Sequence, residues 1–181
     1  MNRVKQAARK FSFAVAAWLL FISLSAHAQA PDWKTYRYAA DGFGASFPSE
    51  PSAGRRNIPT EAGSFELHTY VAQENGVVLY VGVCDYGASL AGKDPDAVLQ
   101  GAKTGALNSS AAHLLSEKAV AIGSAHGLSF ESESDQAHFS ARIYLVGATL
   151  YQTLVVMQLG KTYANTDRFL DSLQLFARTA N

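Results

Sequence analysis

The dipeptide Asn75-Gly76 constrains the fold of this 181-residue chain more than any other short segment. Both residues tolerate the left-handed backbone that a two-residue β-hairpin loop requires, and apolar, β-branched stretches flank them. We therefore predict two antiparallel strands, over residues 64–72 and 77–86. The second stretch is apolar on both of its faces, which is typical of an interior strand that is covered on both sides.

Three further strands are predicted over residues 128–133, 136–146 and 149–159, separated by two short turns. Apolar and polar residues alternate along them, so one face belongs to the core and the other is at least partly wet. Both turns keep the same apolar residues on one face, which supports a single register. The pairs expected to face each other are Phe130 with Phe139, Leu128 with Ala141, Leu145 with Leu150, and Tyr144 with Tyr151.

The remaining strands are less regular. Residues 32–51 are interpreted as a short opening β segment. Residues 48–63 are rich in proline and glycine, which predicts a loop or an irregular sheet edge because proline donates no ladder hydrogen bond. Residues 114–122 form an ambiguous strand, and residues 165–173 are expected to form the final helix.

A longer helix is predicted to begin after Asp94 and to run to about residue 107. The Asp94 side chain can cap the free N–H groups, and Pro95 suits the first turn. Glycine weakens a helix, so tertiary packing must hold this element. Its apolar stripe consists of small residues, and we expect it to pack closely onto a sheet. The stripe comprises Ala97, Val98, Gly101, Ala102 and Gly105.

The first residues have the pattern of a secretory signal peptide. Four basic residues and no acidic one lie in the first ten positions, an uncharged apolar stretch covers residues 11–24, and Ala26 and Ala28 follow. We predict that residues 1–28 are removed after Ala28, with Ala30 as the second choice. The alternative is a retained membrane anchor, but this stretch is shorter than the roughly 20 apolar residues that span a bilayer.

The mature chain is expected to form one domain over residues 29–176, followed by a frayed tail over residues 177–181. The full chain balances 15 basic against 15 acidic residues, and removal of the signal peptide leaves 11 against 15, a net charge of −4. We therefore expect an exported, periplasmic or secreted protein that binds no nucleic acid and has no membrane span after cleavage. Cys84 is the only cysteine, so we interpret it as a small buried hydrophobe.

Several segments resemble the PsbP-like superfamily, which includes the Mog-type and DcrB-type proteins. They are Tyr38, Gly42-Phe43, Ala45-Ser46-Phe47-Pro48, residues 141–147, Leu150-Tyr151 and residues 168–173. The resemblance implies an α+β fold in which an antiparallel sheet is flanked by helices, an α/β/α sandwich. It also implies a binding or accessory role without enzyme activity, and it provides no catalytic motif to transfer.

No catalytic residue or cofactor site is predicted, because the chain has no nucleophile elbow and no phosphate-binding loop. One cluster of side chains suggests a metal-binding site. The hairpin register places Glu66 opposite Asp85, with His68 on the same face, and two carboxylates with an imidazole could hold a divalent cation. The alternative is that both acids lie in water at the end of the sheet, with His68 partly buried.

A second cluster lies on the polar face of the later strands, where Glu131 is expected to face His138. It could contact a ligand, or it could be a solvated face with cross-strand ion pairs. The tyrosines could mark an interface or could cover the second face of the sheet beneath a helix. The candidate surface comprises Glu131, His138, Arg142, Tyr144 and Tyr151.

These observations predict an exported, non-catalytic binding or accessory domain that acts in the cell envelope on a protein or a small molecule. The alternative is a small exported enzyme, such as a hydrolase, with a cleft near the strand ends. A deep pocket that holds a buried histidine or carboxylate with a perturbed pKa would favour the enzyme.

Overall fold

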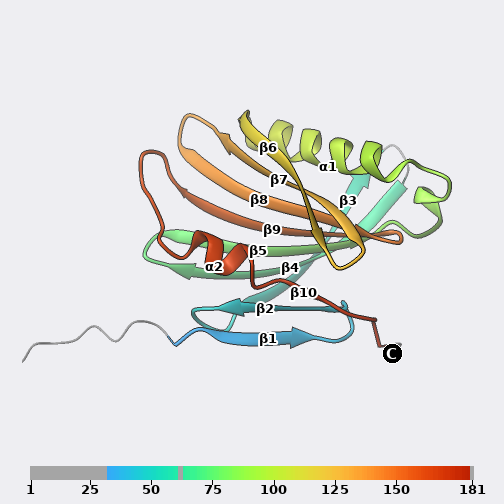
Figure 1. Cartoon of the computed structure of the whole chain (residues 1–181), viewed down its shortest axis with the longest axis horizontal. Coiled ribbons are helices and arrows are strands. Elements are labelled where there is room, and N and C mark those ends of the chain that lie inside the picture. Colours follow the sequence, from blue (N-terminus) through green and yellow to red (C-terminus); the bar gives the residue numbers. More distant parts are fainter. Residues whose placement is uncertain (1–31, 61–62, 180–181) are drawn as a thin grey trace, which may run out of the picture. The chain divides into compact units, whose positions relative to one another are not determined.

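The computed structural model describes residues 32–60 and 63–179, so the predicted signal peptide lies outside the described residues. Within these ranges one antiparallel sheet has seven strands (Figure 1). In chain order these strands are β3 (Ser52–Thr60), β4 (Gly63–Glu74), β5 (Val77–Asp85), β6 (His113–Ile122), β7 (Ala125–Glu133), β8 (Ala137–Val146) and β9 (Thr149–Gln158). Their spatial order is β3-β4-β5-β9-β8-β7-β6.

A smaller antiparallel sheet and three helices complete the described chain. The small sheet has the order β1-β2-β10, with β1 spanning Lys34–Tyr38, β2 Phe43–Phe47 and β10 Gln174–Leu175. The helices are α1 (Pro95–Ser110), α2 (Thr166–Leu170) and the 3₁₀ helix η1 (Gly87–Leu90). None of the helices in the described ranges is long and apolar enough to cross a membrane.

The predicted hairpin at Asn75-Gly76 is confirmed. Both residues have positive φ angles, 51° and 79°, and β4 pairs with β5 in the expected register. Strand β5 lies between β4 and β9, and its central residues Leu79 and Val81 are fully buried. The apolar character of this segment on both faces therefore did identify an interior strand.

The strands β8 and β9 also pair as predicted, with Tyr144 opposite Tyr151. The predicted register of β7 against β8 is wrong by two residues, because Phe130 faces Ala141 rather than Phe139. The connection is longer than two residues, and the Ser134 N–H donates to the carbonyl of Ala137 across it. A shift of two keeps every side chain on its predicted face, since side chains alternate with a period of two.

The proline-rich segment is a strand rather than a loop. Strand β3 pairs with β4 along its whole length without a bulge, and it forms one edge of the large sheet. Pro59 is tolerated because an edge strand needs ladder hydrogen bonds on one side only. Strand β6 forms the other edge, so the ambiguous segment before residue 122 is also β structure.

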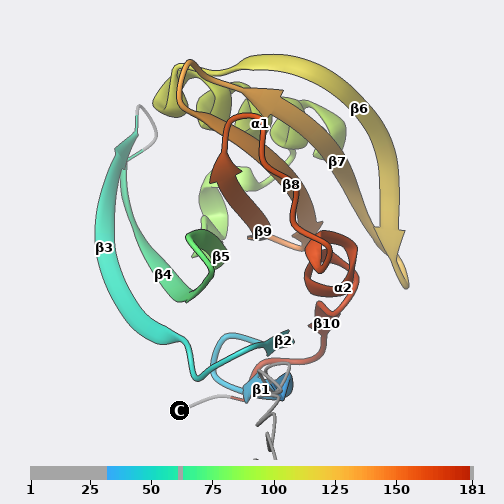
Figure 2. The same cartoon turned by 90° about the vertical axis from the view of Figure 1, so that its left-hand side faces the viewer.

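The two faces of the large sheet are covered differently, and the sheet itself is curved (Figure 2). One face carries the small sheet and α2, and it forms the larger core cluster around Phe43, Phe47 and Phe169. The other face carries α1, whose Leu99 packs among side chains of β7 and β8. Helix α2 ends at Leu170, earlier than predicted. This architecture confirms the predicted α+β class, an antiparallel sheet with helices packed on it.

Helix α1 begins as predicted, with the Asp94 carboxylate accepting a hydrogen bond from the Asp96 N–H at 3.3 Å. Its packing differs from the prediction. The residues that it buries are Leu99 and Lys103, and the ammonium of Lys103 forms a salt bridge with Glu117 on β6. The stripe of small residues around Gly101 does not lie closely against the sheet and instead borders an open space.

Candidate ligand-binding site

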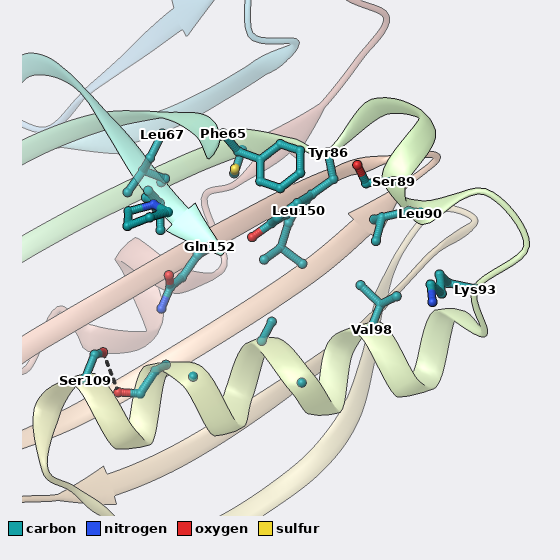
Figure 3. Close-up of a pocket in the computed structure, with 18 of the residues that line it drawn as sticks. Phe65, Leu67, Tyr86, Ser89, Leu90, Lys93, Val98, Ser109, Leu150 and Gln152 are labelled. Carbon is teal, nitrogen blue, oxygen red and sulfur yellow. Dashed lines mark hydrogen bonds between the residues drawn. The ribbon is translucent and has the colours of Figure 1, made fainter. Parts of the chain in front are cut away.

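A cavity of about 800 Å³ lies between α1 and the sheet face that this helix covers (Figure 3). Strands β3, β4, β5 and β9 form one wall, α1 forms the other, and η1 closes one end. The size is typical of sites that take a small organic ligand, about 300–1,000 Å³. Its apolar lining includes Phe65, Leu67, Cys84, Leu90, Val98 and Leu150.

The helix wall stays open because it lacks large side chains. A Cβ atom added at Gly101 or Gly105 would meet no heavy atom within 4 Å. Leu99 and Ala106 anchor the helix against the β7–β8 side of the sheet, so it is held at a distance from β3, β4 and β5. The small stripe that suggested close packing is therefore one wall of a cavity.

The sheet wall also contains a glycine, which makes room for a neighbouring side chain rather than leaving open space. A Cβ atom at Gly82 would lie 2.5 Å from the hydroxyl oxygen of Tyr80, so glycine lets the tyrosine side chain cross this part of the wall. Burial raises the pKa of Tyr80, and the nearby charge of Arg56 opposes that effect. The hydroxyl is therefore protonated at neutral pH and can donate a hydrogen bond.

Cys84 lies in the same wall and is buried, as predicted. Burial raises the pKa of its thiol, although a hydrogen bond with Tyr86 acts in the opposite direction. A thiol with a raised pKa is a poor nucleophile. The described residues that line the cavity include no histidine, so none of them supplies an imidazole that could activate the thiol as a general base.

The proposed metal ligands are only partly brought together, on the opposite face of the sheet. His68 lies between Glu66, whose Oε2 is 2.7 Å from Nε2, and Asp41, whose Oδ1 is 2.8 Å from Nδ1. Asp85 is not in hydrogen-bond contact with Glu66 or His68 and instead pairs with Arg178 at 2.5 Å. The two carboxylates bind opposite sides of the ring, and no metal-binding group of three or more acidic, histidine or cysteine side chains occurs in the described residues.

Asp41 is the member of this cluster that the sequence analysis missed. It lies in the tight turn between β1 and β2, is only 4% exposed, and accepts a hydrogen bond from the hydroxyl of Tyr70 at 2.5 Å. Burial opposes protonation of His68, but the hydrogen bonds to Glu66 and Asp41 outweigh it and raise the pKa of this histidine. The cluster is therefore a chain of polar contacts that ties the small sheet to the large one.

The polar residues of the later strands also gather around a histidine. His138 Nε2 lies 2.8 Å from Glu131, and Nδ1 lies 3.0 Å from Glu133. Because the register is shifted, Glu131 faces Ser140 directly and reaches His138 diagonally. Burial opposes protonation, but the hydrogen bonds to the two glutamates raise the pKa of His138. This cluster is half-buried and consists of cross-strand pairs.

The other members of the predicted binding surface are not available as a surface. Tyr144 and Tyr151 are 2% and 3% exposed and belong to the core beneath the small sheet and α2. The Tyr151 hydroxyl donates to the backbone carbonyl of Asp41 at 2.9 Å. Arg142 is held in a salt bridge with Asp171, just beyond α2. Tyr144 and Tyr151 therefore cover the second face of the sheet, whereas Tyr80 and Tyr86 lie on the face that α1 covers.

The seven-stranded antiparallel sheet, with α1 on one face and the small sheet and α2 on the other, defines a PsbP-like α+β fold. The chain is similar to the solution structure of cyanobacterial PsbP (CyanoP) from Synechocystis sp. PCC 6803, with a TM-score of 0.57 over 83% of this chain and 96% of that one. The two sequences are 12% identical, so the likeness concerns the fold alone. No protein-family model matches the sequence. A search among curated proteins also finds no match.

Proposed function

We propose that this protein is an exported, non-catalytic binding domain that holds a small, largely apolar molecule between α1 and the large sheet. The observation that carries this proposal is the preformed cavity of about 800 Å³, whose lining is mainly apolar. Ligand sites in proteins are typically concave, largely preformed and apolar, with a few polar groups that orient the ligand.

The titratable clusters support binding rather than catalysis. Both histidines with raised pKa values, His68 and His138, lie on the face of the sheet opposite the cavity. Their carboxylate partners are already engaged with them at hydrogen-bond distance. A hydrolase would need a base directed into the cleft, and this arrangement does not provide one from either histidine.

The proposed location outside the cytoplasm rests on the first 28 residues, whose basic start, apolar stretch and small residues have the pattern of an export signal. A partner or ligand in the cell envelope fits the mature chain's net charge of −4, which gives no attraction to nucleic acid or anionic lipid.

A fluorescent apolar probe, N-phenyl-1-naphthylamine, tests the proposed function directly. We expect its fluorescence to rise on binding to the purified protein. Gly101→Leu and Gly105→Leu should each weaken binding at least tenfold, because the new side chains project into the open space. Leucine favours a helix over glycine by about 0.5–1 kcal/mol, so these variants should keep α1 folded.

The matched control is Thr104→Leu, which adds an apolar side chain to an exposed position of α1 that does not line the cavity. This variant should bind the probe as the unmodified protein does. If the probe does not bind, or if all three variants bind it equally well, the cavity is not a ligand site and the proposal is wrong.

A further inference from the structure

Three side chains that can form hydrogen bonds lie on the sheet wall of the cavity, on the strands β3, β5 and β9. Gln152 on β9 pairs directly with Gly82 on β5, and the hydroxyl of Tyr80 lies over that glycine. Arg56 on β3 is close enough to influence the charge state of Tyr80. All three residues line the cavity, and we treat them together as a polar corner of a mainly apolar site.

The polar corner is defined as Arg56, Tyr80 and Gln152. No hydrogen bond or salt bridge joins the side chain of any of the three to another side chain in residues 32–60 and 63–179. The neighbouring Arg55 behaves differently, because its side chain points to the other face of β3 and pairs with Glu66 at 3.7 Å. Arg56 is thus the arginine of this strand that remains available to a ligand.

The charges of the described residues that line the cavity favour an anion. Among them Arg56 and Lys93 are cationic, whereas the single acidic residue, Asp94, uses its carboxylate to cap α1. A guanidinium, a protonated phenol and a primary amide can all donate hydrogen bonds. A carboxylate accepts such bonds strongly, particularly from arginine.

Resting on the proposed function, we infer that the ligand is an alkyl carboxylate whose anionic head binds the polar corner. Its apolar chain would extend between α1 and the sheet, over Leu67, Leu150 and Val98. The lining follows α1 from Asp94 to Ser109, which corresponds to about 22 Å at 1.5 Å per residue. The cavity is therefore long enough for an extended chain rather than only a compact molecule.

Displacement of N-phenyl-1-naphthylamine separates the head group from the chain. Three competitors of equal chain length are compared below their micelle concentrations: dodecanoate, dodecan-1-ol and dodecyltrimethylammonium. The measured quantity is the ratio of the half-displacing concentrations of the alcohol and the carboxylate. Arg56→Gln should lower this ratio about fivefold, the effect of a solvent-accessible charge pair of about 1 kcal/mol.

The control is Arg55→Gln, which removes the same charge from the adjacent position on the opposite face and should leave the ratio unchanged. Tyr80→Phe should also lower the ratio, as Arg56→Gln does, because it removes one hydrogen-bond donor and keeps the aromatic ring in the cavity wall. Raising the salt concentration should also weaken the carboxylate more than the alcohol.

The outcomes distinguish the two proposals. If Arg56→Gln leaves the ratio unchanged, or if the ammonium compound displaces the probe better than dodecanoate, the inferred head-group site is wrong while the apolar binding function stands. If the alcohol and the carboxylate both fail to displace a probe whose binding is sensitive to Gly101→Leu, the inferred ligand class is wrong. If the probe itself does not bind, the proposed function fails as well.

Discussion

Removal of the Asp41 carboxylate should destabilise the protein by about 3 kcal/mol. The carboxylate is buried and interacts with the Tyr70 hydroxyl at 2.5 Å and with His68 Nδ1 at 2.8 Å. A hydrogen bond to a charged group contributes about 1.5–3 kcal/mol. We count the buried Tyr70 contact in full and the His68 contact in part, because the His68 side chain is 19% exposed and can bind water instead.

The assay is a double-mutant cycle in urea, with unfolding followed by circular dichroism at constant pH. Asp41→Ala should cost about 3 kcal/mol and Tyr70→Phe about 1.5 kcal/mol, with a coupling energy of at least 1 kcal/mol between them. Asp41→Asn keeps an acceptor oxygen and should cost less than Asp41→Ala. A cost below 1 kcal/mol for Asp41→Ala, or strictly additive effects, would refute the idea that this contact holds the two sheets together.

Two further predictions concern pH and export. The raised pKa values of His68 and His138 mean that their stabilising contribution is complete below about pH 6.5 and is lost as the pH rises through the folded-state values. The urea midpoint of unfolding should therefore decrease as the pH is raised from 6 to 9. The decrease should be smaller in His68→Asn and in His138→Asn, and an unchanged decrease in these variants would contradict the assignment. Intact-mass measurement of the extracytoplasmic protein should give a chain that starts at Gln29 or Pro31, and a mass that includes Met1 would exclude cleavage.

The strand pattern was predictable because local signals determined it. Asn75-Gly76 fixed one register through its backbone geometry, and the alternation around Tyr144 and Tyr151 fixed another. The register at Ser134 was missed, since serine can extend a turn by accepting hydrogen bonds from the backbone N–H groups of the next residues. Even there the face of each side chain was correct.

The candidate site was not predictable in the same way. A stripe of small residues is compatible with close packing and with a cavity, and only the anchoring of α1 through Leu99 decides between them. No pattern in the sequence marked Arg56 as a binding residue, because it lies in a proline-rich segment that was interpreted as a loop or an irregular edge. Once that segment is known to be a strand, the alternation of side chains between the two faces of the sheet places Arg56 on one face and Arg55 on the other.

The small sheet joins residues from both ends of the described chain. Gly44 on β2 pairs with Gln174 on β10, and the Phe176 N–H donates to the carbonyl of Gly42 at 2.9 Å. Because β10 follows the strands of the large sheet in the sequence, the β1–β2 hairpin gains its third strand only after those strands have been synthesised. Folding of the small sheet therefore depends on a contact between distant parts of the sequence, and such long-range pairing slows folding compared with local hairpins.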